Sequence, residues 1–156
     1  MRPSAHPQAL RVQAVLGDGF TVVEFDESTH TAQEAADAIG CQLAQIAKSI
    51  LFRSAGGKPV LVIASGTNRV DEKKIRALLG EKIERASPDF VKEATGFEVG
   101  GVPPLGHASA CVAYLDEELK AYPTLWAAGG TPNAVFEIGF GQLAEMSGAT
   151  VADVKK

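Results

Sequence analysis

Two apolar runs separated by a glycine pair constrain the fold of this chain more than any other feature. Residues 46–52 and residues 59–64 both have the composition of β-strands, and Gly56-Gly57 lies between them. Two such runs joined by a short glycine-containing loop predict an antiparallel hairpin. A hairpin argues against a pure succession of βαβ units, so we expect a mixed α/β domain.

Capping residues and composition predict the other elements. Thr31 and Glu34 have the spacing of a capping box, and Gly40 follows where a short helix would stop. The expected helices cover residues 4–16 (with Ser4 as N-cap), 31–40, 71–80, 87–95 and 140–147, with a further turn at 151–155. The expected strands cover residues 20–25, 46–52, 59–64, 108–115, 125–128 and 134–138. A length of 156 residues predicts one domain, residues 1–156.

Lys48 is the unusual residue of the first hairpin strand. Side chains alternate along a strand, so Ile46, Lys48, Ile50 and Phe52 share one face, opposite Ala47, Ser49 and Leu51. A buried ammonium group needs an acceptor or an anionic ligand, because burying it alone is costly. The alternative is an edge-strand lysine that reaches water or blocks aggregation.

Composition narrows the class of protein. A hydrophobic fraction of 46% and a charged fraction of 22% are typical of an ordinary globular domain. No apolar run approaches the roughly 20 residues that span a bilayer, and the N-terminus lacks a signal-peptide core, so we expect a cytoplasmic protein without a membrane partner. Cys41 and Cys111 form no CxxC pair, and we interpret Cys111 as a buried free thiol.

Charge is unevenly distributed along the chain. The net charge of −4 argues against a general nucleic-acid binder, and we expect no DNA partner. Residues 40–92, however, carry ten basic and five acidic side chains, for a local charge of +5. Solvated helix faces explain most such runs, and a basic surface for an anionic partner is the other interpretation. We interpret the acidic trio at residues 116–118 as a solvated turn.

Two loops rich in glycine and proline, Gly100–His107 and Gly129–Asn133, are candidate ligand loops. Glycine allows positive φ and the close approach of a ligand to backbone N–H groups, so each loop could present amides to an oxyanion or a phosphate. Neither loop matches a P-loop or a dinucleotide-binding fingerprint. A purely structural turn is the alternative for each loop.

Several kinds of catalytic site are absent from the sequence. His6, His30 and His107 lie far apart and form no metal-binding pattern, so we expect no metal and no cofactor. His30 and His107 are each ambiguous between a substrate contact and a turn residue. No GxSxG motif and no Cys/His arrangement indicates a covalent nucleophile. Any hydrolysis would therefore depend on positioned water, backbone donors and Lys48.

The order of these motifs resembles the YbaK/ProX family. The resemblance covers about residues 20 to 150. It is carried by four segments in this order: residues 31–36, residues 46–50 around Lys48, the Gly100–His107 loop, and Gly129-Gly130-Thr131. Members of this family are aminoacyl-tRNA deacylases, similar to the editing domain inserted in bacterial prolyl-tRNA synthetases. The resemblance implies a mixed, barrel-like β-sheet surrounded by helices. It also implies hydrolysis of the ester that joins a wrong amino acid to tRNA, typically tRNA for proline.

The resemblance also assigns site residues. The family's key lysine would be Lys48, and its pocket loops would be Gly100-Gly101 and Gly129-Gly130. We expect catalytic roles for Lys48, Gly129 and Gly130, and substrate contacts from residues of the two loops, namely Gly100, Gly101, His107, Thr131 and Pro132. In the branch that removes alanine, a histidine stands where this chain has residues 129–132. The Gly-Gly form therefore resembles the branches that remove cysteine and other small residues.

These expectations combine into a mechanism without a protein nucleophile. Lys48 would anchor the terminal adenosine, and the amides of Gly129, Gly130 and Gly101 would polarise the ester carbonyl. A ribose hydroxyl or the side chain of the substrate would activate water. Because the chain is acidic, capture of aminoacyl-tRNA would use a prolyl-tRNA synthetase or an elongation factor as partner. A non-catalytic tRNA- or synthetase-associated module, and a hydrolase of small esters unrelated to tRNA, remain as alternatives.

Overall fold

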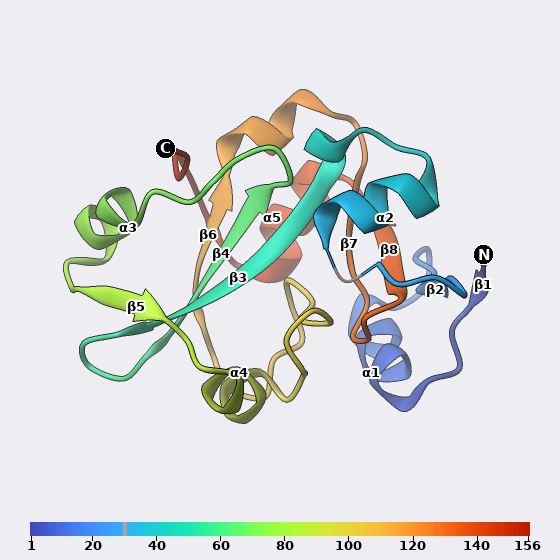
Figure 1. Ribbon diagram of the computed structural model, residues 1–156, viewed down its shortest axis with the longest axis horizontal. Coiled ribbons are helices and arrows are strands. Elements are labelled where there is room, and N and C mark those ends of the chain that lie inside the picture. The colour runs from blue at the N-terminus through green and yellow to red at the C-terminus, as the bar shows by residue number, and fades with distance from the viewer. Residues whose placement is uncertain (30) are drawn as a thin grey trace.

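The computed structural model describes residues 1–29 and 31–156 and consists of a mixed β-sheet with helices packed on both of its faces (Figure 1). Its strands are β1 (Arg2–Pro3), β2 (Val23–Glu24), β3 (Ile46–Ser54), β4 (Pro59–Ser65), β5 (Ile83–Arg85), β6 (Val112–Asp116), β7 (Leu125–Ala128), β8 (Ala134–Ile138) and β9 (Thr150–Ala152). Its α-helices are α1 (Pro7–Leu16), α2 (Ala32–Ile39), α3 (Glu72–Leu79), α4 (Pro88–Thr95) and α5 (Phe140–Ser147). Two short 3₁₀ helices are η1 (Leu43–Gln45) and η2 (Glu117–Ala121). In the described part of the chain no helix has the length and apolar character to cross a membrane.

The sheet is mixed, as expected, and it is open rather than closed into a barrel. The strands follow the order β1-β2-β8-β7-β3-β4-β6-β9, and β5 pairs with β3 beside this path. The two strands at the ends of the order, β1 and β9, do not pair with each other. The pairs β3–β7, β4–β6 and β6–β9 are parallel and the others are antiparallel. The mixed fold predicted from the hairpin is therefore confirmed.

The predicted hairpin of β3 and β4 forms the middle of this sheet, and its side chains alternate as expected. Ala47 and Leu51 belong to the main core, which the sheet shares with α1, α4 and α5. On the opposite face Ile46 packs with α2, whereas Phe52 packs with Ile75 of α3. Lys48 lies on this second face, between the two apolar clusters.

One stretch of β3 has a neighbour on one side only. β3 pairs with β7 at Ile46 and Ala47 and with β5 from Phe52 to Ser54, and both partners lie on the same side, away from β4. Between these two pairings no strand of the described residues pairs with β3 on that side. We call residues 48–50 the open stretch of β3.

Four of the predicted helices are confirmed, three of them with the caps that the sequence predicts. Thr31 and Glu34 form the predicted capping box of α2, and Gly40 ends that helix in the left-handed conformation. Asp71 and Ser87 cap α3 and α4 by accepting hydrogen bonds from backbone N–H groups. The span of residues 140–147 for α5 is also confirmed. These signals act within one turn of the helix, so the sequence shows them directly.

The N-terminal predictions were partly wrong. Helix α1 begins at Pro7 with His6 as its N-cap, because the His6 side chain accepts from the Gln8 N–H and proline suits the first helical position. The expected strand at residues 20–25 shortens to β2. The side chain of Gln13 bonds the Phe20 carbonyl and the Val22 N–H, which takes these groups out of a strand ladder.

Two further boundaries are set by contacts distant in sequence. The strand expected at 108–115 begins only at Val112, because the N–H groups of Ala108 and Ser109 donate to carbonyls at the end of α4. The turn expected at 151–155 is wrong, since residues 150–152 form β9, parallel to β6.

The expectation of a solvated turn at residues 116–118 is wrong for Asp116. Its side chain is fully buried. The carboxylate accepts hydrogen bonds from the Ser65 N–H at 3.0 Å, the Asn68 side-chain amide at 2.8 Å and the Glu118 N–H at 3.0 Å. Three donors compensate the loss of water around a buried carboxylate, so Asp116 joins the ends of β4 and β6.

Candidate functional site

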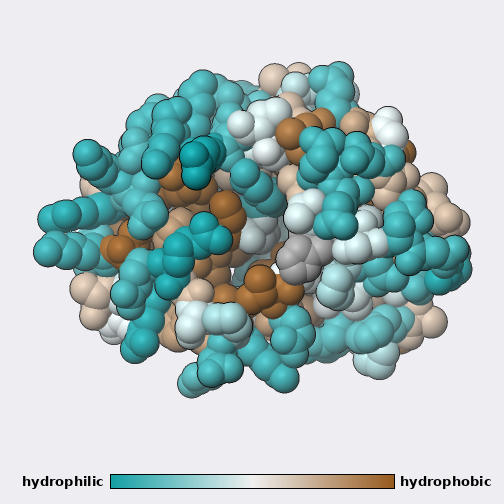
Figure 2. All heavy atoms as spheres, in the orientation of Figure 1, coloured by the Kyte–Doolittle hydropathy of each residue, from teal (hydrophilic) through white to brown (hydrophobic). Residues whose placement is uncertain are grey.

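A small cavity opens beside the open stretch of β3. Its volume is about 80 Å³, and Figure 2 shows the molecular face hollowed near its centre, beside the place of β3 in Figure 1. The walls come from α2 and the residues before it, from β3, from β7 and β8, and from the Gly100 loop. The lining residues are Thr29, Thr31, Ala32, Ala35, Ile46, Ala47, Lys48, Ser49, Gly100, Val102, Trp126, Ala127, Ala128 and Val135.

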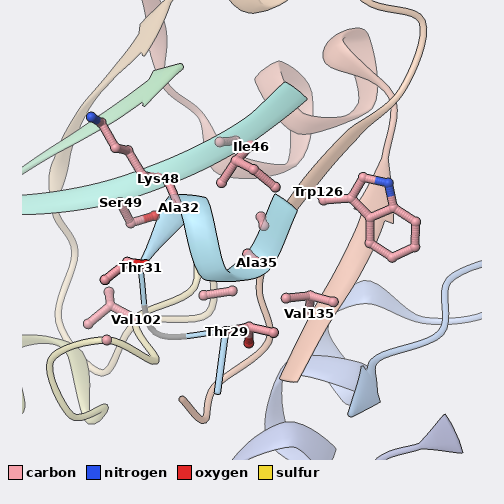
Figure 3. Close-up of a pocket in the computed structure, with 14 residues that line it drawn as sticks. Thr29, Thr31, Ala32, Ala35, Ile46, Lys48, Ser49, Val102, Trp126 and Val135 are labelled. Atoms are coloured by element: carbon pink, nitrogen blue, oxygen red, sulfur yellow. The ribbon is translucent and has the colours of Figure 1, made fainter. Parts of the chain in front are cut away.

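Lys48 stands at one side of this cavity with its ammonium group directed away from Trp126 (Figure 3). The side chain is half-buried, and its ammonium has no hydrogen bond or ion pair with any residue that the structure describes. Burial lowers the pKa of Lys48, and the positive charges of Arg69 and Arg85 lower it further, while Asp116 opposes them. An anion at this position would therefore pair with a positive charge that no described residue neutralises.

Arg69 and Arg85 extend the positive charge around Lys48. Both arginines are exposed, and neither has an ion pair among the described residues. Arg85 is in register with Phe52 and lies over its ring at 5.8 Å, which places it on the Lys48 face of the sheet. Residues far apart in the sequence thus form one basic surface at the cavity, defined here as Lys48, Arg69 and Arg85.

The two glycine-rich loops contact each other beside the cavity. A Cβ atom at Gly101 would lie 2.9 Å from the Cα of Thr131 and 3.0 Å from the carbonyl oxygen of Gly130. No real Cβ tolerates such a distance to backbone, so only glycine permits this approach of the two loops. Gly100 and Val102, on either side of Gly101, line the cavity.

The loop amides are largely engaged by the protein. The Gly129 N–H donates to the Ala134 carbonyl at 2.8 Å, and the Gly101 N–H donates to the Glu98 carbonyl at 3.1 Å. The Pro132 carbonyl accepts from the backbone and the hydroxyl of Thr29, at 2.7 and 3.1 Å, and so fixes Thr29 in the cavity wall. The loops therefore shape the cavity. Of the predicted residues, Lys48 and Gly100 line it directly.

His107 lies in a different depression of the surface. The structure places it with Cys111 in a shallow hollow lined partly by α5 residues, and its Nε2 lies 2.7 Å from the Pro103 carbonyl oxygen. Burial lowers the pKa of His107 and raises that of the Cys111 thiol to about 11. Cys111 is thus a protonated, half-buried free thiol at neutral pH.

The cavity also includes residues that the sequence did not single out as functional. Trp126, the single tryptophan, forms part of the wall, and its rarity was the available signal. Ser49 follows Lys48 directly, and its oxygen is turned toward α2 in Figure 3. Thr29 gave no signal in the sequence, because the Pro132 carbonyl that places it lies 103 residues away.

Acid–base groups are missing from the described lining. None of the described residues that line the cavity is His, Asp, Glu or Cys. No group of three or more such residues arranged to hold a metal occurs among residues 1–29 and 31–156. His30 lies outside the described residues.

Comparison with known proteins relates this geometry to one family. The model of the aminoacyl-tRNA editing domain matches residues 26–146. The chain is 41% identical to the uncharacterized protein YwhH of Bacillus subtilis over 126 residues, which are 81% of this chain and 80% of YwhH. It is 35% identical to the proline–tRNA ligase of Maridesulfovibrio salexigens over 101 residues, or 64% of this chain. The match spans only 17% of that ligase.

A solved structure agrees over the whole chain. It is that of a protein provisionally described as a trans-editing enzyme for prolyl-tRNA synthetase, with a TM-score of 0.92 and 46% sequence identity. The superposition covers 98% of this chain and 99% of the solved one. The similarity therefore includes the loops and strands that form the cavity.

Proposed function

The chain belongs to the aminoacyl-tRNA editing domain family, and on this basis we propose that it is a trans-editing hydrolase for mischarged aminoacyl-tRNA. The reaction cleaves the ester between a small, wrong amino acid and the terminal adenosine, with tRNA for proline as the carrier. The similarity to a prolyl-tRNA synthetase trans-editing enzyme and to part of a proline–tRNA ligase supports this carrier. In this proposal residues 1–156 act as one editing domain in the cytoplasm.

The observation that carries the proposal is the unpaired ammonium of Lys48 beside a small cavity that is lined by both apolar and hydroxyl side chains. The terminal nucleotide of tRNA brings a phosphate, and the aminoacyl group brings a small side chain on the same short segment. Lys48 would hold the phosphate or a nearby acceptor of the terminal adenosine, with Arg69 and Arg85 adding positive charge around it. The aminoacyl group would then enter the cavity.

Water attack in this site would rely on the substrate. The described cavity lining offers no general base, so the neighbouring ribose hydroxyl or the amino-acid side chain would activate the water. Because the Gly129 and Gly101 amides already donate to protein carbonyls, we assign these loops the shaping of the cavity. The Gly130 amide remains our candidate for polarising the ester carbonyl. Ribose assistance is tested by comparing the deacylation rates of substrates that end in adenosine and in 2′-deoxyadenosine. Equal rates for the two substrates would exclude it.

Selectivity in this proposal comes from cavity size. The volume of about 80 Å³ compares with about 10–15 Å³ needed for one water molecule, so a group of several heavy atoms fits. Alanine, cysteine, serine and 2-aminobutyrate are the candidate substrates. One methylene in such a pocket changes selectivity by about 1–3 kcal/mol, so we expect graded rather than absolute discrimination among them.

A deacylation panel tests the function. The wild-type chain is incubated with tRNA for proline charged with each of the four candidate amino acids, and ester hydrolysis is followed above the buffer rate. Lys48→Ala should lose most of the activity. Lys74→Ala is the matched control, because Lys74 is committed to an ion pair with Asp153 at 2.7 Å. Equal activity of wild type and Lys48→Ala would remove Lys48 from the mechanism.

The panel also separates the alternatives. A non-catalytic tRNA- or synthetase-associated module predicts no hydrolysis with any of the four substrates. A hydrolase of simple amino-acid esters predicts activity without RNA. Adding prolyl-tRNA synthetase or an elongation factor tests whether either partner raises the rate, as the acidic net charge of −4 leads us to expect.

A further inference from the structure

Ser49 carries a buried hydroxyl that the protein does not use. Three hydroxyl side chains line the cavity, and two of them have partners: Thr29 donates to the Pro132 carbonyl, and Thr31 accepts from the Glu34 N–H. Ser49 Oγ is the one buried side-chain oxygen or nitrogen in the described part of the chain without a hydrogen-bond partner. Buried polar groups are nearly always bonded, so an unpaired one in a cavity wall needs an explanation.

Other serines of the same hairpin show that this is not a general property of these strands. Ser65 Oγ donates to the Ala44 carbonyl at 2.9 Å, and Ser54 Oγ accepts from the Lys58 N–H at 3.0 Å. Both positions lie on β3 or β4, as Ser49 does. The fold thus satisfies the other two serine hydroxyls of the hairpin and leaves that of Ser49 without a partner among the described residues.

The backbone of Ser49 also faces the cavity side of the strand. The backbone groups of successive residues along β3 point alternately to its two sides. The Ile46 carbonyl points to the β4 side, where it accepts from the N–H of Gly66, just after β4. The Leu51 carbonyl points to the other side, where it accepts from the N–H of Ala86, just after β5. Ser49 therefore points its backbone groups to the same side as Leu51. That side is the open stretch, where no described strand pairs with it.

We propose that Ser49 is a substrate-binding residue whose hydroxyl and open backbone edge hydrogen-bond the aminoacyl group of the substrate. The inference rests on the proposed function. It adds a polar contact inside a pocket whose other side chains are mostly apolar or already bonded. No described residue bonds the Ser49 hydroxyl, and the bound ester would supply its partner.

The occupant is the aminoacyl group rather than a tRNA phosphate. Ser49 Oγ is buried in the wall, whereas the Lys48 ammonium is directed away from Trp126 and Val135 on the other side of the cavity (Figure 3). The α-amino group and the ester carbonyl are the polar atoms that accompany a small side chain into a cavity of about 80 Å³. A phosphate would instead meet Lys48, Arg69 and Arg85.

The test uses an isosteric pair of variants. Ser49→Thr and Ser49→Val place side chains of the same shape on a β-strand and differ in the hydroxyl. We expect Ser49→Thr to keep kcat/KM within a few fold of wild type, and Ser49→Val to fall about 10- to 100-fold below Ser49→Thr in deacylation. Equal kcat/KM for the Thr and Val variants, with an active wild type, overturns the proposal for Ser49 alone.

Stability separates a ligand contact from a structural role. Removing an unpaired buried hydroxyl should leave the melting temperature of Ser49→Ala unchanged or higher than wild type. The control Ser65→Ala should have a lower melting temperature than wild type, because it leaves the Ala44 carbonyl without its hydrogen-bond donor. A Ser49→Ala protein destabilised as much as Ser65→Ala would contradict the inference. A wild-type chain inactive on every aminoacyl-tRNA would reject the proposed function itself, which the Thr/Val comparison does not do.

Discussion

The buried carboxylate of Asp116 accepts a hydrogen bond from the backbone N–H of Ser65 at 3.0 Å. Ser65 is the last residue of β4, and Asp116 is the last residue of β6. The same oxygen accepts from Asn68 at 2.8 Å, in the turn that leads to Arg69. The contact therefore fixes the turn that carries Arg69 to the neighbourhood of Lys48.

Asp116→Ala should be strongly destabilising. The change leaves the buried Ser65 N–H without an acceptor and removes two further bonds, so we expect a loss of about 2–4 kcal/mol in the free energy of unfolding. Asp116→Asn should lose less, because it keeps the shape and one acceptor oxygen. Urea denaturation of the two variants measures both values, and an Asp116→Ala protein within 0.5 kcal/mol of wild type, roughly the range of surface substitutions, would show that water replaces the carboxylate.

Gly101→Ala should separate the two glycine loops. Its Cβ would lie 2.9 Å from the Cα of Thr131, and backbone cannot yield as a flexible side chain would, so we expect a loss of about 1–3 kcal/mol together with reduced deacylation. Gly141→Ala is the matched control in α5, where an added Cβ meets no atom within 4 Å, and it should be neutral or stabilising. Thermal melts and the deacylation rate of both variants decide the case. Similar behaviour of the two alanine variants would mean that the loops shift apart without cost.

Lys48→Met should raise stability at neutral pH while removing activity. The folded state lowers the pKa of Lys48 below 10.5, so its charged form is less favourable folded than unfolded. That penalty is complete below the folded-state pKa and disappears as pH rises to the unfolded value. The stability advantage of Lys48→Met should therefore be largest below the folded-state pKa and shrink as pH rises from that pKa toward 10.5. Denaturation curves at a series of pH values check the sign, and a gap that widens with pH would contradict it.

Arg69→Ala should reduce the salt dependence of tRNA binding. Arg69 is exposed, lies near Lys48 and has no ion pair among the described residues, so it is available for a phosphate. Losing one phosphate contact should lower the slope of log K against log salt by about 0.7–0.9. Lys74→Ala should leave the slope nearly unchanged, since Lys74 already pairs with Asp153. Fluorescence anisotropy with labelled tRNA between low and physiological salt gives the slopes, and identical slopes for wild type and Arg69→Ala would exclude this contact.

Local signals in the sequence predicted much of the fold. The capping box of Thr31 and Glu34, the caps at Asp71 and Ser87 and the glycine hairpin act within a few residues, and each is present in the structure. β9 and the start of β6 depend on partners far along the chain, so composition alone misplaced them.

The candidate site was predictable in part for the same reason. Lys48 is conspicuous because a charge interrupts an apolar strand. Thr29 reaches the cavity only because the Pro132 carbonyl holds it, and Arg69 approaches Lys48 only through the turn that Asp116 fixes. Ser49 was visible beside Lys48, but a small polar residue in a strand says nothing about whether its hydroxyl has a partner.

The open stretch of β3 has one more consequence, for association between molecules. Unpaired strand edges commonly recruit a strand from another chain, which leads to aggregation. Here the exposed backbone lies at a cavity wall beneath α2, with β7 ending before it and β5 beginning after it. A flat strand cannot dock along so short and recessed a segment, whereas a compact group can. The interruption of the sheet thus offers hydrogen-bonding groups to a compact group while leaving too short an edge for a second strand to pair.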